Sequence, residues 1–228
     1  AVICAWLLTL WRDGEDFPGW IWATSLAAIL VFILVLQPDI GMTSVIALTW
    51  GFQMFLAGMP MLLVLITIAL APLCLYAAYL FLPHVEARIN RFLDGGSMQT
   101  RKSIESFSEG GFFGVGPGDG QVKLHLPDAH ADFIFSVAAE EYGVLACLFL
   151  IGLYGFFLLR GFELSATGTS LFNLLAGAGL IMQFVVQASI HMASSVDLIP
   201  AKGMTLPLIS YGGSSLVTSG ITVGIILA

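Results

Sequence analysis

Residues 133–158 read FIFSVAAEEYGVLACLFLIGLYGFFL, and this run decides the fold class of the chain. A helix needs about 20 apolar residues to cross a bilayer, and the run is longer than that. Lipid offers no hydrogen-bond partners, so such a run must satisfy its own backbone, which a helix does. The same pattern recurs along the chain, giving apolar segments at about 1–11, 20–36, 42–58, 60–82, 133–158, 170–193 and 214–228. The sequence therefore predicts an all-α, polytopic transmembrane helical bundle that forms a single membrane domain over residues 1–228.

The composition agrees with this class. Of the 228 residues, 58% are hydrophobic and 10% are charged, whereas about a quarter of the residues in a soluble globular domain are charged. The formal net charge of −7 argues against nucleic acid as a partner. The chain opens at Ala1 and closes at Ala228 within apolar runs, so we expect it to be a piece of a longer protein, truncated at both ends.

Two connections between the apolar segments are long, at 83–132 and 194–213. Because two complete spans lie between them, both connections should emerge on the same side of the membrane. Most of the Lys and Arg residues lie in these two connections. Taken alone, the positive-inside rule would make that side cytoplasmic.

The stretch KLHLPDAHADF, 123–133, gathers titratable side chains at the foot of the longest apolar run. Pro127 suits the first turn of a helix, and a helix that begins there places Asp128 and Asp132 at positions i and i+4 of one face. Such a pair could supply a general base or hold a divalent cation, with His130 as a further ligand. The alternative is a solvated polar cap on a helix end.

Glu140 and Glu141 follow inside the apolar run, about 12 Å beyond Asp132 at the helical rise per residue. Carboxylates at that depth are costly and point to a functional site. A structural pair that bonds to a neighbouring helix is the alternative.

The glycine-rich stretch EGGFFGVGPGDG, 109–120, lacks the preceding strand and the following Gly-Lys-Ser/Thr of a nucleotide site. We expect a bent loop that lies against the membrane surface.

Gln183, Gln187 and His191 recur every four residues and predict a polar stripe on one helix face. The stripe could make interhelical hydrogen bonds, or it could line a polar cavity.

The stretch IPAKGMTLPLISYGGSS, 199–215, holds Lys202 between prolines, and a helix opens at Ser214 and Ser215. A fixed cation near helix N-terminal amides favours an anion such as a phosphate. A plain re-entrant turn with a solvated lysine is the alternative.

These stretches, together with LQPDIGMT at 36–43, resemble the SEDS family (shape, elongation, division and sporulation) along essentially the whole chain. The motifs are most similar to those of the division branch of the family, and the elongation branch is second. The family has ten transmembrane helices, which implies that this chain holds about seven of them. The resemblance also implies that the connection 83–132 is extracytoplasmic. This is the opposite of what the positive-inside rule indicates from the Lys and Arg residues.

The resemblance further implies peptidoglycan glycosyltransfer, in which lipid II is polymerised into glycan strands and undecaprenyl pyrophosphate leaves. The essential Asp of the family falls on Asp132, the Lys of its KG-TLP motif on Lys202 and the Asp of its PD-G-T motif on Asp39. We therefore expect Asp132 to act as the general base. The residues expected to bind the substrate and its pyrophosphate are Lys202, Lys123, Arg88, Arg91, Asp128, His130, Asp39, Glu140, Ser214 and Ser215.

Cofactors and partners follow from the same resemblance. A Mg²⁺ or Mn²⁺ ion on Asp128 and Asp132 would change Asp132 from a base to a ligand. The implied protein partners are a class B penicillin-binding protein, which is the cognate transpeptidase, and other proteins of the division machinery. The implied location is the bacterial inner membrane at the division septum. Two other functions stay open, a flippase for lipid-linked sugars and a non-catalytic scaffold of that machinery.

Overall fold

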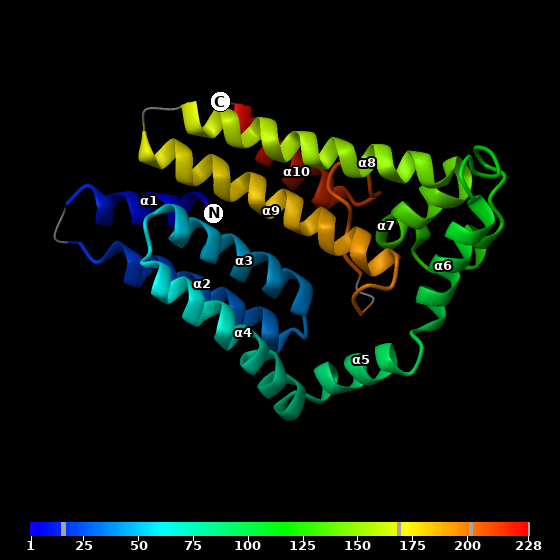
Figure 1. Ribbon diagram of the computed structural model, residues 1–228, viewed down its shortest axis with the longest axis horizontal. Helices are drawn as coiled ribbons and strands as arrows, with labels where there is room; N and C mark the ends of the chain where they lie inside the picture. Colours follow the sequence, from blue (N-terminus) through cyan, green and yellow to red (C-terminus); the bar gives the residue numbers. More distant parts are fainter. Residues whose placement is uncertain (15–16, 168–169, 201–202, 228) are drawn as a thin grey trace. The chain divides into compact units, whose positions relative to one another are not determined.

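The computed structural model describes residues 1–14, 17–167, 170–200 and 203–227, and this part of the chain is helical apart from turns and loops (Figure 1). The helices, in chain order, are α1 (Val2–Arg12), α2 (Gly19–Leu36), α3 (Ile40–Leu56), α4 (Met61–Phe81), α5 (Pro83–Leu93), α6 (Met98–Gly110), η1 (Val122–His125), α7 (Ala129–Asp132), α8 (Ile134–Thr167), α9 (Leu171–Ser195) and α10 (Gly213–Leu227). The prediction of an all-α fold is confirmed.

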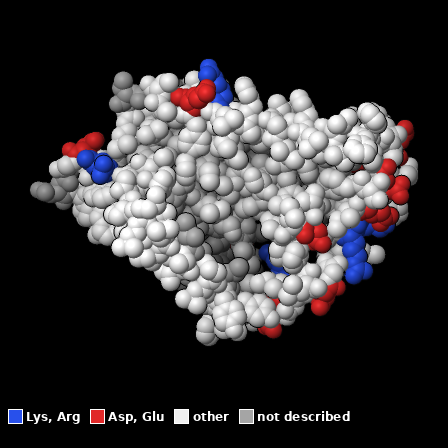
Figure 2. Space-filling view, in the orientation of Figure 1, with Lys and Arg blue, Asp and Glu red and all other residues white. Residues whose placement is uncertain are grey.

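Among the described residues, three helices are long and apolar enough to cross a bilayer, namely α2, α8 and α9. Shorter apolar helices occupy three of the other predicted segments, at α1, α3 and α10, and α4 occupies the fourth, 60–82. Figure 2 shows that charged side chains are sparse over the apolar helices and gather near α5 and α6. The chain is therefore a membrane protein.

Two compact units make up the chain. One contains residues 1–87 and 158–183, and the other contains residues 88–157 and 184–227. The long helices α8 and α9 contribute one part to each unit. Each unit has its own buried core, and each is described by itself.

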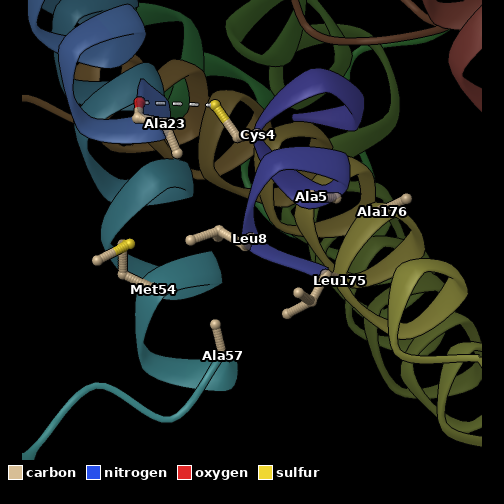
Figure 3. Close-up of a cluster of buried hydrophobic side chains, with 8 residues drawn as sticks. All are labelled: Cys4, Ala5, Leu8, Ala23, Met54, Ala57, Leu175 and Ala176. Carbon is tan, nitrogen blue, oxygen red and sulfur yellow. Dashed lines mark hydrogen bonds between the residues drawn. The ribbon is translucent and has the colours of Figure 1, made fainter. Parts of the chain in front are cut away.

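The core of the first unit is built from small and medium side chains of α1, α2, α3 and α9 (Figure 3). Small residues let helices approach closely, which is how helices gain contact in a membrane, where lipid is as apolar as leucine. Gly19 shows the approach directly, because a Cβ atom at this position would lie 1.9 Å from the Leu7 carbonyl oxygen. The buried Gln53 amide also donates to the Leu175 carbonyl at 3.0 Å and so ties α3 to α9.

The connection 83–132 contains most of the short helices of the chain. Helix α5 spans the unit boundary, and α6, η1 and α7 lie in the second unit. Their polar composition is the reason that a search for apolar segments does not identify them. The Ser97 hydroxyl accepts a hydrogen bond from the Thr100 amide at 3.2 Å and so fixes the start of α6.

Helix α8 is interrupted at Gly143, whose backbone is not helical and has a positive φ, with φ 79° and ψ −179°. In an unbroken helix the amides of Val144 and Leu145 would bond to the carbonyls of Glu140 and Glu141. Here the two amides donate to the Gly111 and Phe112 carbonyls at 2.9 and 3.4 Å. The freed Glu140 and Glu141 carbonyls accept from the amides of residues 115 and 116, at 2.9 and 3.1 Å. The glycine-rich segment therefore satisfies the two amides and the two carbonyls of these two helical hydrogen bonds.

Glycine is required where the two backbones meet. A Cβ atom on Gly114 would lie 2.1 Å from the Glu141 carbonyl oxygen, and one on Gly143 would lie 2.3 Å from the Phe112 carbonyl oxygen. Both residues also have positive φ, at 80° and 79°. The sequence places glycine here because neither the space nor the backbone angle admits a side chain.

We expect Gly114→Ala to destabilise the protein much more than Gly118→Ala. Both positions have positive φ, so both substitutions incur the cost of about 1–2 kcal/mol of a left-handed alanine. A Cβ on Gly118 meets nothing within 4 Å, whereas one on Gly114 collides with Glu141. The apparent unfolding temperature of the full-length protein in detergent measures the difference, and equal shifts would contradict the close approach.

Candidate functional site

The short helix α7 carries Asp132 at its last position and begins at Ala129. The predicted helix start at Pro127 is wrong, because Asp128 has φ 52° and ψ 33°, a left-handed conformation that no α-helix continues through. Asp128 instead precedes the helix, and its carbonyl accepts from the Asp132 amide at 2.9 Å. Asp128 and Asp132 are therefore not two positions of one helical face.

The segment after Gly203 is held against α7 by hydrogen bonds from its far end. The Tyr211 amide donates to the His130 carbonyl at 2.9 Å, and the Ser210 hydroxyl donates to the Ala131 carbonyl at 2.6 Å. The same hydroxyl accepts from the Leu206 amide at 2.7 Å, which closes the turn. Residues 79 positions apart in the sequence thus become neighbours.

Helices α8 and α9 hold the same segment from other sides. Gln187 donates to the Thr205 carbonyl at 3.0 Å, His191 Nδ1 bonds to the Met204 carbonyl at 2.5 Å, and the Tyr154 hydroxyl donates to the Pro207 carbonyl at 2.5 Å. Of the predicted polar stripe, Gln187 and His191 therefore make structural hydrogen bonds. Gln183 lies in the other compact unit.

This anchoring sets Gly203 against the carboxylate of Asp132. A Cβ atom on Gly203 would lie 2.6 Å from Asp132 Oδ2, so only a hydrogen-sized group fits between them. Asp132 is half-buried. Burial raises the pKa of its carboxyl above the ordinary value, the Asp128 carboxylate raises it further, and His130 opposes both. A carboxylate with a raised pKa is a stronger base.

Gly203 also lines a pocket of about 220 Å³. Two arginines face it, together with polar groups of the α5–α6 turn and of α6; its lining is Arg88, Arg91, Phe92, Gly96, Ser97, Gln99, Thr100, Pro200 and Gly203. The Nη1 atom of Arg88 is buried and has no hydrogen-bond partner in the described part of the chain. Leaving a charged donor unsatisfied is costly, so this pocket suits an anion.

Two further predicted residues hold the loop structure. Glu140 is 1% exposed, and its two carboxylate oxygens accept from the amides of Val122 and Lys123 at 2.7 and 2.9 Å. The Lys123 ammonium pairs with Glu141 and donates to the Gly118 carbonyl at 3.2 Å. Glu140 and Lys123 thus have partners within the protein, and Glu140 matches the structural alternative.

The remaining predicted residues are dispersed. Ser215 bonds to the Thr205 hydroxyl at 2.8 Å, while Ser214 is exposed in the first turn of α10. Asp39 accepts from the Met42 amide at 3.0 Å and caps α3, in the other compact unit. Lys202 lies outside the described residues.

The described residues contain no group of three His, Cys, Asp or Glu side chains placed to hold a metal ion. The Mg²⁺ or Mn²⁺ ion predicted on Asp128 and Asp132 therefore stays a prediction. Mg²⁺ is often held by one or two carboxylates plus substrate phosphates, a set of ligands that these two carboxylates and a pyrophosphate would supply.

Sequence reasoning missed the residues that position the site, chiefly Gly203, Ser210 and Tyr211. The glycine that follows Lys202 was a signal for close backbone approach. The sequence does not show which residue approaches this glycine, because Asp132 is distant from it along the chain.

Comparisons with known proteins agree with one another. A family model described as a cell cycle protein, covering FtsW, RodA and SpoVE, matches residues 2–228. The chain is 40% identical over 230 residues to a probable peptidoglycan glycosyltransferase FtsW of Caulobacter vibrioides, which covers 100% of this chain and 59% of that protein. The corresponding protein of Legionella pneumophila is 36% identical over 228 residues, covering 93% and 57%. The chain thus spans less than two thirds of the length of these relatives.

Solved structures resemble the chain as well. One is a chain of a peptidoglycan synthase complex described as showing structural coordination of polymerization and crosslinking, with a TM-score of 0.77 and 29% identity, covering 98% of this chain and 66% of that one. Another is a variant of the rod shape determining protein RodA of Thermus thermophilus, with a TM-score of 0.60 and 26% identity, covering 98% and 62%.

We expect Gly203→Ala to move the Asp132 carboxylate, because the new methyl group would occupy its place. Carboxyl footprinting with a water-soluble carbodiimide, read by mass spectrometry, should then show faster labelling of Asp132. Gly213→Ala is the matched control, since a Cβ there meets nothing within 4 Å. Unaltered labelling of Asp132 in the Gly203 variant would show that the two residues are not in contact.

Proposed function

Since the chain belongs to the FtsW, RodA and SpoVE family of cell cycle proteins, we propose that it forms the catalytic part of a peptidoglycan glycosyltransferase. Its substrate would be lipid II, which it polymerises into glycan strands during septal cell-wall synthesis. The names of the two FtsW relatives, both probable peptidoglycan glycosyltransferases, support this type of reaction. The observation that carries the proposal is that Gly203 touches the Asp132 carboxylate and also lines the pocket of Arg88 and Arg91.

In this reaction Asp132 is the general base. The 4-hydroxyl of the acceptor sugar attacks the anomeric carbon of the donor, and a new carbon–oxygen bond forms as the bond to pyrophosphate breaks. The hydroxyl proton passes to the Asp132 carboxylate, and the electron pair of the broken bond leaves with undecaprenyl pyrophosphate. A positioned base typically contributes about 10²–10⁴-fold to the rate. The raised pKa of Asp132 suits this task.

The pocket of Arg88 and Arg91 receives the pyrophosphate of the donor. Arginine presents a planar fork of donors that matches phosphate oxygens, and the unpaired Nη1 of Arg88 supplies one such donor. Fixed cations stabilise the negative charge that grows on the leaving group. Lys123 is a weaker candidate for this role, because its ammonium is paired with Glu141. Lys202, next to Gly203 in the sequence, remains a predicted binding residue for the same pyrophosphate.

The two alternative functions, a flippase for lipid-linked sugars and a non-catalytic scaffold of the division machinery, receive less support. A translocation path needs free polar groups along the membrane, but Gln187 and the Nδ1 atom of His191 are bonded to the backbone of residues 205 and 204. A scaffold has no use for a half-buried carboxylate with a raised pKa beside a cationic pocket.

The partners and location follow the same proposal. A class B penicillin-binding protein would crosslink the strands that this protein makes, and a relative in structure comes from a complex described by polymerization and crosslinking. Other division proteins would recruit the pair. The protein would lie in the inner membrane at the septum, with the connection 83–132 on the extracytoplasmic side.

We expect Asp132→Asn to abolish polymerisation of labelled lipid II by the purified full-length protein with its partner. The amide keeps the shape of the side chain but cannot accept the proton. Expression and unfolding temperature should stay close to those of the parent protein. Retained polymerisation would remove Asp132 from the reaction, whether as base or as metal ligand.

The Asp128 carboxylate allows a test of the base through the pH dependence of polymerisation. Polymerisation needs ionised Asp132, so activity should fall as the pH drops through its raised pKa. Asp128→Asn removes one cause of the elevation. The acid limb of the pH–rate profile should therefore move to lower pH while polymerisation persists. A limb that moves to higher pH, or does not move, would contradict this electrostatic coupling.

We expect Arg88→Gln to lower kcat/KM for lipid II by roughly ten- to a hundredfold, the size of one charge-assisted hydrogen bond. Arg88→Lys should recover part of the loss, because it restores the charge without the fork. Arg160→Gln is the matched control, since Arg160 pairs with Glu163 at 2.9 Å on an exposed surface. A loss in the control as large as that in Arg88→Gln would refute a specific anion site.

A further inference from the structure

The loop that fills the break in α8 carries two exposed aromatic side chains. Phe112 is 73% exposed and Phe113 is 81% exposed. Their backbone is fixed by the hydrogen bonds of Gly111 to Val144 and of Phe112 to Leu145. The two rings are therefore held at one level of α8. We call residues 110–120 the interfacial loop.

That level can be located along the membrane span. Arg160 is the first charged residue after the pair Glu140 and Glu141, and the residues between them are uncharged. About 20 helical residues cross the hydrocarbon of a bilayer, which is the length from 141 to 160. The break at Gly143 then lies at the boundary between hydrocarbon and headgroups, and so does the interfacial loop that is bonded to it.

An exposed apolar stripe of α8 begins at the same point. Leu145, Leu148 and Phe149 are all exposed, and they occupy positions i, i+3 and i+4 of one helix face. Leu145 is also the residue whose amide bonds to Phe112. The backbone of the exposed rings is thus bonded to the first residue of an exposed apolar stripe, which suits contact with lipid.

We propose that the interfacial loop is a membrane anchor, in which Phe112 and Phe113 insert into the outer boundary of the bilayer. Its partner is lipid, at the level where aromatic side chains form belts around membrane proteins. The turn beyond Val115 leads back to water, since Asp119 on the same loop is charged and exposed.

The anchor would also fix the height of the site, a step that rests on the proposed function. Asp132 precedes Glu141 by nine residues, so at the helical rise it stands about 13.5 Å outside the hydrocarbon. Glu140 strengthens the link, because it joins α8 to the amides of Val122 and Lys123 that follow the loop. A pyrophosphate attached to a membrane lipid lies within that range.

Spin labels test the depth of the loop directly. Phe113→Cys and Asp119→Cys are compared in the full-length protein, with its native cysteines replaced, reconstituted in liposomes of phosphatidylethanolamine and phosphatidylglycerol. The label at 113 should collide more with oxygen, which concentrates in lipid, than with a water-soluble nickel chelate. The label at 119 should show the reverse. Equal access of the nickel chelate to both labels would overturn the proposal.

A second arm separates lipid from protein as the partner. If the label at 113 is open to the nickel chelate in liposomes and becomes protected only when the class B penicillin-binding protein is added, the loop is a protein-docking surface and the anchor is rejected. Repeating the depth measurement in Asp132→Asn separates the two proposals. The anchor predicts the same depth in that variant, whether or not Asp132 proves to be the base.

Discussion

Backbone groups that lipid cannot satisfy are the constraint on which the second unit depends. Breaking α8 at Gly143 frees two amides and two carbonyls, each of which would cost about 1–3 kcal/mol if left unpaired in apolar surroundings. The segment 111–116 satisfies all four. The segment therefore stabilises the break, and the backbone groups that the break frees in turn hold the segment. Helix and loop fold as one unit, and the carboxylate of Glu140 extends that unit to η1.

Hydrogen bonds to backbone groups also position the candidate site. Residues 203–212 have no regular secondary structure of their own, and they are held by side chains of α8 and α9 and by the backbone of α7. A segment fixed from several sides has little freedom to move, which is what catalysis by preorganised groups requires. Asp132 gains a half-buried position in this way while the adjoining pocket remains open.

The apolar helices could be predicted from the sequence because lipid imposes one local rule on every run, such as 133–158. The site could be predicted only in part. Asp132 stood out as a carboxylate at the foot of a span, but its contact with Gly203 depends on residues that are distant in the sequence. The false helix start at Pro127 has a local cause, the left-handed backbone of Asp128, which no pattern of residue types reveals.

Pairing within the protein decides which cations remain for a substrate. Lys102, Lys123 and Arg160 each form an ion pair with a neighbouring glutamate. Arg88 has a buried nitrogen with no partner in the described residues and faces the pocket beside Asp132. A buried donor without a partner is costly unless a ligand completes it. An anionic ligand that accepts from this nitrogen would remove that cost through binding.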